Sequence, residues 1–139
     1  MILIVCTDAR GGIRFNCRRQ SRDRAVAADI LACAAGRPLW MHPSSAALFA
    51  DAPNIRTDEN APLCAGADEL CFWEDALPPV CAARVTGLIR YNWNRIYPAD
   101  VYWNLDPAAA GLTLLRRAEF AGSSHAKITR EEFGYGTET

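Results

Sequence analysis

The chain has 139 residues, of which half are hydrophobic and 22% are charged, and its formal net charge is −1. This composition is that of one ordinary globular domain with a hydrophobic core, and the near-neutral charge excludes a protein that binds polyanions over its whole surface. The sequence lacks an apolar run of about 18 residues, so we expect no membrane span. The apolar start is too short for a signal peptide and reaches Asp8 and Arg10 at once, which favours a cytoplasmic protein.

The chain contains six cysteines and two histidines, His42 and His125. No CxxC motif is present, and Cys33 and Cys71 have apolar neighbours, where a free cysteine packs as a small hydrophobic residue. We therefore expect reduced thiols and no metal site, with a disulfide framework or a metal centre as the alternative.

The N-terminal stretch organises the rest of the chain. Met1–Val5 is a β-branched-rich run, typical of a strand buried on both faces. The pair Gly11-Gly12 follows, and we expect it to turn with positive φ and to let a ligand approach the backbone. We expect a polar loop rich in arginine after the turn, called the arginine loop below, and then a helix. Strand, glycine turn, polar loop and helix N-terminus in this order form ligand sites at the carboxyl ends of strands in open α/β sheets.

Strands alternate with helices in the first half of the chain, and strands alone follow. Apolar spacing and turn residues predict a helix at 22–35 capped by Ser21, a strand at 38–41, a helix capped by Ser44 or Ser45, a strand at 54–56, a helix or turn at 58–65, and strands at 69–73, 84–92 and 101–105. Residues 112–120 and 125–133 predict an antiparallel pair, and Gly87 indicates a bulge. We expect an α/β domain over 1–133, whose mainly parallel sheet ends in antiparallel strands, and a flexible tail at 134–139.

Arginines concentrate around the start of the first helix. They are Arg10, Arg14, Arg18, Arg19, Arg22 and Arg24. Guanidinium groups and free helix N–H groups converging near Ser21 could hold a phosphate or a carboxylate. The alternative is a solvated loop in which Asp23 pairs with a neighbouring arginine.

Two further segments carry polar side chains that could bind or react. Residues 91–100 combine asparagines, aromatic rings, Arg95 and Asp100, which suits a nucleobase or a pteridine-like ring. The favoured alternative is a hairpin corner whose asparagines tie the turn. Ser123 and His125 would share a strand face as nucleophile and base, but no acid that could orient the histidine is identifiable, so a turn-forming role is favoured.

Several strings resemble the dihydrofolate reductase family over most of the chain. That family opens with an apolar strand, a loop with an Ile-Gly-x-x-x-Asn pattern and a helix that carries the substrate-binding carboxylate near its start. The similar residues here are Gly12–Asn16 and Asp23, and Trp40–Ser45, Leu88–Asn92, Ala99–Trp103 and Ser124-His125 are similar to later strings of the family. The resemblance implies a three-layer fold, an NADPH cofactor, and a proton-donating or ring-binding Asp23; the favoured alternative for Asp23 is an acid that complements the helix dipole.

The chain departs from this family at its cofactor motifs. Arg19-Gln20 replaces the Pro-Trp pair, and Pro43 replaces the arginine of the cofactor turn. Glu74-Asp75 stands where a glycine loop would cradle the cofactor, and acids repel a phosphate. NADPH therefore stays a candidate whose glycine-rich loop is missing.

Three strings, FN-x-RRQS-x-DR, YNWNR-x-YPAD and GSSH-x-KIT, are also similar to small clostridial-type proteins labelled ribonuclease Z. Ribonuclease Z needs a His-x-His-x-Asp-His cluster to hold two zinc ions. His42 and His125 are far apart in the sequence and belong to no such cluster, so we do not expect that chemistry.

We expect a cleft between the arginine loop and the corner at 92–100 that binds an anionic small molecule, a nucleotide or a phosphorylated metabolite. The candidate residues are Asp23 for catalysis and Asn16, Arg18, Arg19, Ser21, Arg22, Asn92, Asn94, Arg95 and Asp100 for binding. One alternative is a non-enzymatic module that uses the arginine-rich face on RNA or an acidic protein, with strong salt dependence. Another alternative is an NADPH-dependent reductase. The chain has four tryptophans and we expect exposed edge strands, so a homodimer is possible.

Overall fold

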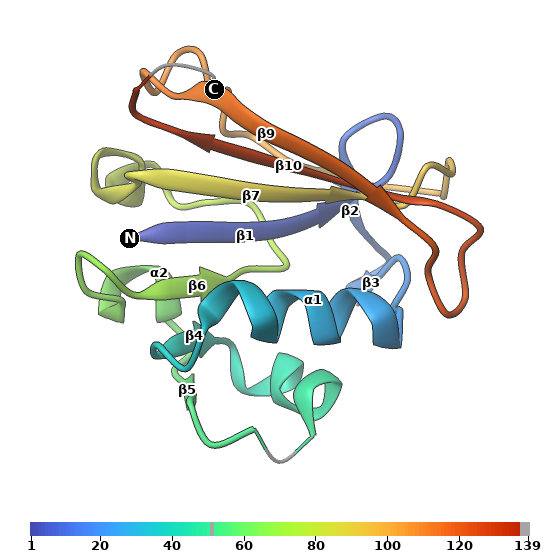
Figure 1. The fold of residues 1–139 in the computed structure, drawn as a ribbon, viewed down its shortest axis with the longest axis horizontal. Coiled ribbons are helices and arrows are strands. Elements are labelled where there is room, and N and C mark those ends of the chain that lie inside the picture. The colour runs from blue at the N-terminus through green and yellow to red at the C-terminus, as the bar shows by residue number, and fades with distance from the viewer. Residues whose placement is uncertain (51, 137–139) are drawn as a thin grey trace.

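A seven-stranded sheet with the order β5-β4-β6-β1-β7-β10-β9 forms the framework of the computed structural model, which describes residues 1–50 and 52–136 (Figure 1). The strands in that order are β5 (Ile55–Thr57), β4 (Leu39–Met41), β6 (Leu70–Phe72), β1 (Ile2–Thr7), β7 (Gly87–Asn92), β10 (Ile128–Gly134) and β9 (Thr113–Phe120). Strands β5 to β7 pair in parallel, whereas β10 is antiparallel to both of its neighbours. The predicted α/β class is confirmed, as is the mainly parallel sheet with an antiparallel pair at its end.

Strand β1 lies in the interior of the sheet because it is apolar on both faces. Leu3 and Val5 belong to one hydrophobic cluster, whereas Ile4 belongs to the other. β1 pairs in parallel with β6 on one side and β7 on the other, so that Ile4 has Phe72 and Ile89 as its register partners. Successive side chains of a strand point to opposite faces of the sheet, so neighbouring residues of β1 enter different clusters.

Helix α1 (Arg24–Ala34) packs on the same face as Ile4. Its buried residues Val26, Ile30 and Ala34 recur at helical spacing and belong to the cluster of Ile4. The 3-10 helix η1 (Pro43–Phe49) joins this cluster through Phe49. Figure 1 shows α1 in front of the sheet, with the long pair β9 and β10 above it.

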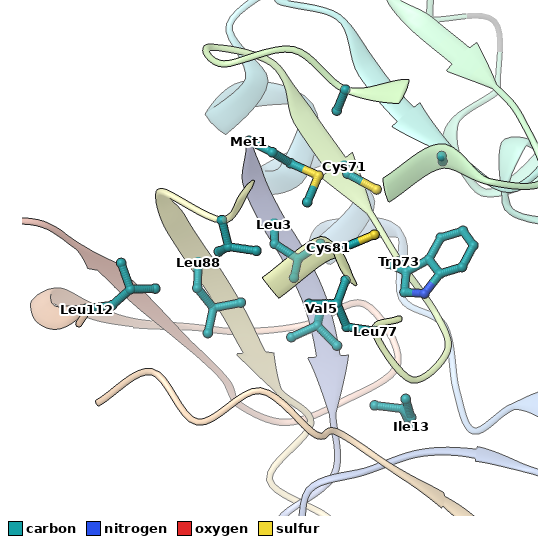
Figure 2. Close-up of a cluster of buried hydrophobic side chains, with 13 residues drawn as sticks. Met1, Leu3, Val5, Ile13, Cys71, Trp73, Leu77, Cys81, Leu88 and Leu112 are labelled. Carbon is teal, nitrogen blue, oxygen red and sulfur yellow. The ribbon is translucent and has the colours of Figure 1, made fainter. Parts of the chain in front are cut away.

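The second cluster contains Leu3 and Val5 and receives side chains from two short helices. Helix α2 (Ala61–Cys64) supplies Ala61, and the 3-10 helix η2 (Pro79–Arg84) supplies Cys81. Figure 2 shows Leu3 and Val5 of β1 beside Cys81, and Leu88 of β7 belongs to the same cluster. None of the helices in residues 1–50 and 52–136 is long and apolar enough to cross a membrane.

A small second sheet has the order β3-β2-β8 and takes two of its three strands from the arginine-rich stretch. Its strands are β3 (Arg18–Arg19), β2 (Gly12–Phe15) and β8 (Val101–Tyr102). The stretch predicted as a polar loop is therefore a β-hairpin, whose turn residues Asn16 and Cys17 have positive φ of 52° and 61°. The strand predicted at 101–105 is shortened to β8 and belongs to this sheet.

The predicted helix caps were wrong. Helix α1 begins at Arg24, and Asp23 rather than Ser21 is its N-cap, because the Asp23 carboxylate accepts from the N–H groups of Ala25 and Val26. Helix η1 is capped by the side chain of His42 instead of Ser44 or Ser45. Several neighbouring residues before each helix have a side chain that can accept a hydrogen bond. The sequence alone therefore does not identify which of them is the N-cap.

Two smaller expectations also change at the ends of β7 and β10. Gly87 pairs in regular register with Ile2 and Gly134, and the irregularity expected there lies instead between Glu132 and Phe133 of β10. Gly134, predicted to begin the flexible tail, is the last residue of β10. Residues 137–139 of that predicted tail lie outside the described residues.

Candidate functional site

A cavity of about 420 Å³ opens where the start of α1 meets the carboxyl edge of the parallel strands. Aromatic and aliphatic side chains from the sheet, α1 and η1 line much of it, and a polar side surrounds the start of α1. The lining residues are Cys6, Ser21, Arg22, Asp23, Arg24, Val26, Ala27, Ile30, Ala47, Leu48, Phe49, Phe72, Glu74, Trp93 and Ser124. A cavity with apolar walls and a few convergent polar groups is the usual form of a small-molecule site.

A buried pair, Asp23 and His125, forms the polar centre of this site. Asp23 Oδ2 lies 2.9 Å from His125 Nδ1, and both side chains are almost fully buried. The same carboxylate accepts hydrogen bonds from the backbone N–H groups of Ser123 and Ser124, at 2.9 and 2.8 Å. Asp23 therefore fixes both the start of α1 and the loop that carries His125.

The surroundings of Asp23 keep it ionised. Burial by itself raises its pKa, but the hydrogen bonds from His125, from the N–H groups of Ser123 and Ser124 and from Ala25 outweigh burial and hold the pKa well below its usual value. A carboxylate held in this way orients its partner and does not serve as a proton donor at neutral pH. Of the roles expected for Asp23, the geometry therefore favours an acid at the start of the helix over a proton donor, and it adds two roles that were not expected, the N-cap of α1 and the orientation of His125.

Two hydroxyl groups contact the other ring nitrogen of His125. Ser21 Oγ lies 3.0 Å and Tyr97 Oη 2.9 Å from Nε2. Because the carboxylate takes the proton-bearing Nδ1, Nε2 of the neutral ring is an acceptor for these hydroxyls. The ring of Trp93 stacks on the imidazole, with centroids 4.6 Å apart and an interplanar angle of 22°.

This arrangement corrects the interpretation of the segment at 123–125. An orienting acid does exist, Asp23, and it lies 102 positions away in the sequence. The hydroxyl groups at Nε2 belong to Ser21 and Tyr97, whereas Ser123 Oγ accepts a hydrogen bond from the N–H of Ala25. His125 precedes β10, so its position is set by the loop and not by a strand face.

A second, shallower cavity of about 640 Å³ adjoins the first and is strongly basic. Its lining residues are Arg14, Cys17, Arg18, Arg19, Ser21, Arg22 and Ser44. Ser21 and Arg22 line both cavities, so the two are contiguous at these residues.

The arginines of the second cavity differ in how their charge is used. Arg19 donates to both carboxylate oxygens of Glu74, at 2.9 and 3.0 Å, and Ser45 Oγ donates to Glu74 at 2.6 Å. The hydrogen bond to Glu74 also raises the pKa of Arg19. Arg18 and Arg22 are exposed, and neither forms an ion pair with another residue of 1–50 and 52–136. Arg14 also has no ion pair, but its guanidinium donates to the backbone carbonyls of Glu74 and Cys17. In this cavity Arg18 and Arg22 are therefore more available to a ligand than Arg14 or Arg19.

Asp8 links the glycine turn to Tyr97, which contacts His125. Its buried carboxylate accepts from the N–H groups of Arg10 and Gly12, both at 2.8 Å, from Gln20 Nε2 and from the N–H of Tyr97. A Cβ on Gly12 would lie 2.6 Å from the Cβ of Ala99, so the protein's own packing disfavours any larger residue there. Asp8 thereby holds Tyr97 next to His125.

The other candidate binding residues lie outside the two cavities. Asn92 Oδ1 accepts from the N–H of Asn94, whose amide donates to Thr129 Oγ1, so both asparagines tie the turn as the favoured alternative predicted. Asp100 accepts from the backbone N–H of Asn16. Arg95 is exposed and lines neither cavity.

The cysteines of the chain are free thiols, and no group of three or more metal-ligating side chains occurs in the part of the chain that the structure describes. Cys6 forms part of the first cavity, and burial, together with the charges of Glu74 and Asp23, raises its pKa well above the ordinary value. A thiol that stays protonated is a poor nucleophile, so Cys6 is an inert wall of the cavity.

A scan against models of known protein families found no match, and a search of curated proteins found no matching relative. The functional argument therefore rests on the geometry of this chain.

The sequence interpretation missed several residues of the site. Phe72, Glu74 and Trp93 lie at or directly after the ends of β6 and β7, where ligand sites form in open parallel sheets, and this position was the available signal. The aromatic rings of residues 91–100 were named only as a group, without singling out Trp93 or Tyr97. His125 was noted but lacked its acid. No local sequence pattern pairs His125 with Asp23, because the two residues are 102 positions apart.

Proposed function

We propose that this chain is a three-layer, dihydrofolate reductase-like domain that binds a small anionic molecule, a nucleotide or a phosphorylated metabolite, across the two contiguous cavities. One observation carries the proposal: Ser21 and Arg22 belong both to the apolar cavity and to the cavity lined by arginines. A molecule with a ring at one end and a phosphate at the other fits such a site.

The apolar cavity suits the ring part of the ligand. Phe49, Phe72 and Trp93 line it, and aromatic faces bind planar rings by stacking or edge contacts. The basic cavity suits the anionic part, because the unpaired guanidinium groups of Arg18 and Arg22 can form two parallel hydrogen bonds to a phosphate or carboxylate.

The arrangement of the sheet supports the family assignment within this proposal. A mainly parallel sheet that ends in an antiparallel pair, a glycine turn after the first strand and a carboxylate at the start of α1 occur in the order expected for that family. Glu74, the carboxylate that pairs with Arg19, lies after β6, where the family's glycine loop would follow. The proposed ligand is therefore a small anion, and NADPH is the weaker candidate.

The test is a thermal-shift series with nucleotides, sugar phosphates, NADPH with folates, and short RNA. A ligand at about 100 times its Kd stabilises a protein by about 2.7 kcal/mol, which is a readable shift for a domain of this size. We expect a small anion to produce this shift and the double variant Arg18→Ala, Arg22→Ala to abolish it. The matched control is Arg116→Ala with Arg117→Ala, which removes two exposed arginines of β9 and should leave the shift unchanged.

An unchanged response in the Arg18, Arg22 variant would overturn the proposal. A response to RNA alone, with an affinity that falls steeply with salt, would favour the interaction module instead. A response to NADPH together with a folate would favour the reductase.

A further inference from the structure

Ser21, His125 and Asp23 are connected in a line that is familiar from nucleophilic enzymes. Ser21 Oγ lies 3.0 Å from His125 Nε2, and His125 Nδ1 lies 2.9 Å from Asp23 Oδ2. We propose that Ser21 is the nucleophile of an esterase site, with His125 as its general base and Asp23 as the group that orients the imidazole. The proposal rests on the proposed binding function for its substrate, but the chemistry depends on the triad alone.

The nucleophile is Ser21 and not Tyr97, although both hydroxyls reach Nε2. Ser21 lines both cavities, whereas Tyr97 lines neither, so a ligand has access to the serine oxygen. The backbone N–H of Tyr97 donates to Asp8, and the Tyr97 hydroxyl lies within hydrogen-bond distance of His125 Nε2. Tyr97 therefore competes with Ser21 for the single lone pair of Nε2 and moderates the base.

The base is preorganised because its whole surroundings are fixed. Trp93 stacks on one face of the ring, and the carboxylate that takes Nδ1–H is held by the N–H groups of Ser123 and Ser124. The ring can therefore neither flip nor change tautomer without breaking buried hydrogen bonds.

The reaction balances with water as the second substrate. Ser21 Oγ bonds to the carbonyl carbon of an ester while its proton passes to His125 Nε2, and the ester C–O bond breaks as the leaving alcohol takes that proton. Water then attacks the acyl-serine carbonyl and gives its proton to Nε2. Oγ leaves and regains a proton, which releases a carboxylic acid.

The charges around Ser21 define the substrate class. Arg22 and Arg24 line the cavity of Ser21 and favour the negative charge that develops on the carbonyl oxygen during attack. Arg18 extends the positive charge into the adjoining cavity. The substrate is therefore a small ester that carries a phosphate or carboxylate group beside an apolar or aromatic part.

The chain contains its own control for this inference. Ser44 Oγ lies 2.8 Å from His42 Nδ1, but this ring nitrogen also accepts from the N–H of Ser44, and no carboxylate of the described residues hydrogen-bonds to His42. Ser44 therefore has a histidine without an orienting acid, and we expect it to be unreactive.

The experiment is covalent labelling of the folded chain by a fluorophosphonate, with peptide mass spectrometry to locate the modified residue. We expect the label on Ser21 and none on Ser44, no label in Ser21→Ala, and unchanged labelling of Ser21 in Thr113→Ala, which removes an exposed hydroxyl of β9 outside both cavities. Tyr97→Phe should label at least as fast as the parent, because the competing hydroxyl is gone. Hydrolysis of p-nitrophenyl acetate should fall about 100-fold in Ser21→Ala.

His125→Ala removes a buried ring and leaves a cavity in the core, so a second variant tests the base without removing it. In Ser21→Cys the introduced thiol should react with iodoacetamide about tenfold faster at pH 7 than the exposed Cys17, because the adjacent imidazole takes up its proton. Alkylation no faster than that of Cys17 would overturn the inference.

The remaining outcomes separate this inference from the proposed function. A folded parent that takes no label at Ser21, or takes it equally at Ser44, overturns the esterase site even if anions bind. Labelling of Ser21 without any anion response leaves the triad standing and removes the proposed ligand class.

Discussion

Asp23, the N-cap of α1, and Asp29, within α1, both bind basic residues of the C-terminal part of the chain, but with different consequences. Each reaches across to a basic residue about a hundred positions later in the sequence, His125 for Asp23 and Arg130 for Asp29. Arg130 Nη1 lies 2.8 and 2.7 Å from the two oxygens of Asp29, and Tyr91 Oη donates to Asp29 at 2.6 Å.

The two pairs differ in whether they leave a group that can exchange a proton at neutral pH. Arg130 is permanently charged, and burial together with Asp29 raises the pKa of Tyr91, so this cluster fixes α1 to the sheet and offers no group that exchanges a proton at neutral pH. The Asp23 pair ends in an imidazole nitrogen that faces hydroxyls beside a cavity. The same helix thus carries one structural pair and one pair suited to chemistry, and the difference lies in the partner.

The largest expected effect comes from Asp23→Ala. It removes the cap of α1 and leaves the buried His125 and two loop N–H groups without their acceptor, so we expect the free energy of unfolding to fall by about 3–5 kcal/mol. Urea unfolding followed by circular dichroism measures it. Asp23→Asn keeps a capping oxygen and should cost less; a loss below about 1 kcal/mol for Asp23→Ala would show that the pair does not stabilise the fold.

Gly122→Ala tests the same pair through the backbone. A Cβ at this position would lie 2.5 Å from Asp23 Oδ2 and 2.9 Å from the carbonyl oxygen of His125, so the loop must shift. We expect a loss of about 2 kcal/mol and a lower rate of Ser21 labelling. Gly66→Ala is the control, because its Cβ would first meet the end of the Glu69 side chain at 3.3 Å. Equal effects at the two glycines would contradict the tight packing around Asp23.

The pH dependence of stability sharpens the comparison further. The folded-state pKa of Asp23 is depressed, so its contribution is fully present above the unfolded-state pKa of about 3.9 and is lost as the pH falls from there towards the folded-state value. We expect the parent to lose up to about 1.4 kcal/mol per pH unit more than Asp23→Asn in this range. Urea midpoints between pH 5 and 2 measure the difference, and parallel curves would exclude a depressed pKa at Asp23.

The smallest effect is expected at the structural pair. Asp29→Asn keeps the hydrogen bond from Tyr91 and weakens the partly exposed ion pair with Arg130, whose side chains are 21% and 23% exposed, so we expect a loss of about 1 kcal/mol. Ligand-induced thermal shifts and the labelling of Ser21 should not change. A change in either would mean that Asp29 also supports the site.

The sequence predicted some residues of the site and misplaced others, for physical reasons that differ. Arg18, Arg22 and Ser21 line the cavities because they follow the first strand and its glycine turn, a position that chain order alone fixes. Asn92 and Asn94 were attributed to binding because amides suit nucleobases, yet the same amides satisfy the backbone and side chains of their own corner. Amide groups serve either role, so residue type does not decide between them.

Sequence by itself determined the framework. The unbroken apolar run at the start predicts β1 buried on both faces, and the helical spacing of Val26 and Ile30 predicts the buried face of α1, since both patterns repeat over a few residues. Only the tertiary structure decided that Asp23 meets His125, and that Arg19 is neutralised by Glu74. Such contacts join positions that no local period relates, because they depend on where the complete path of the backbone brings each side chain.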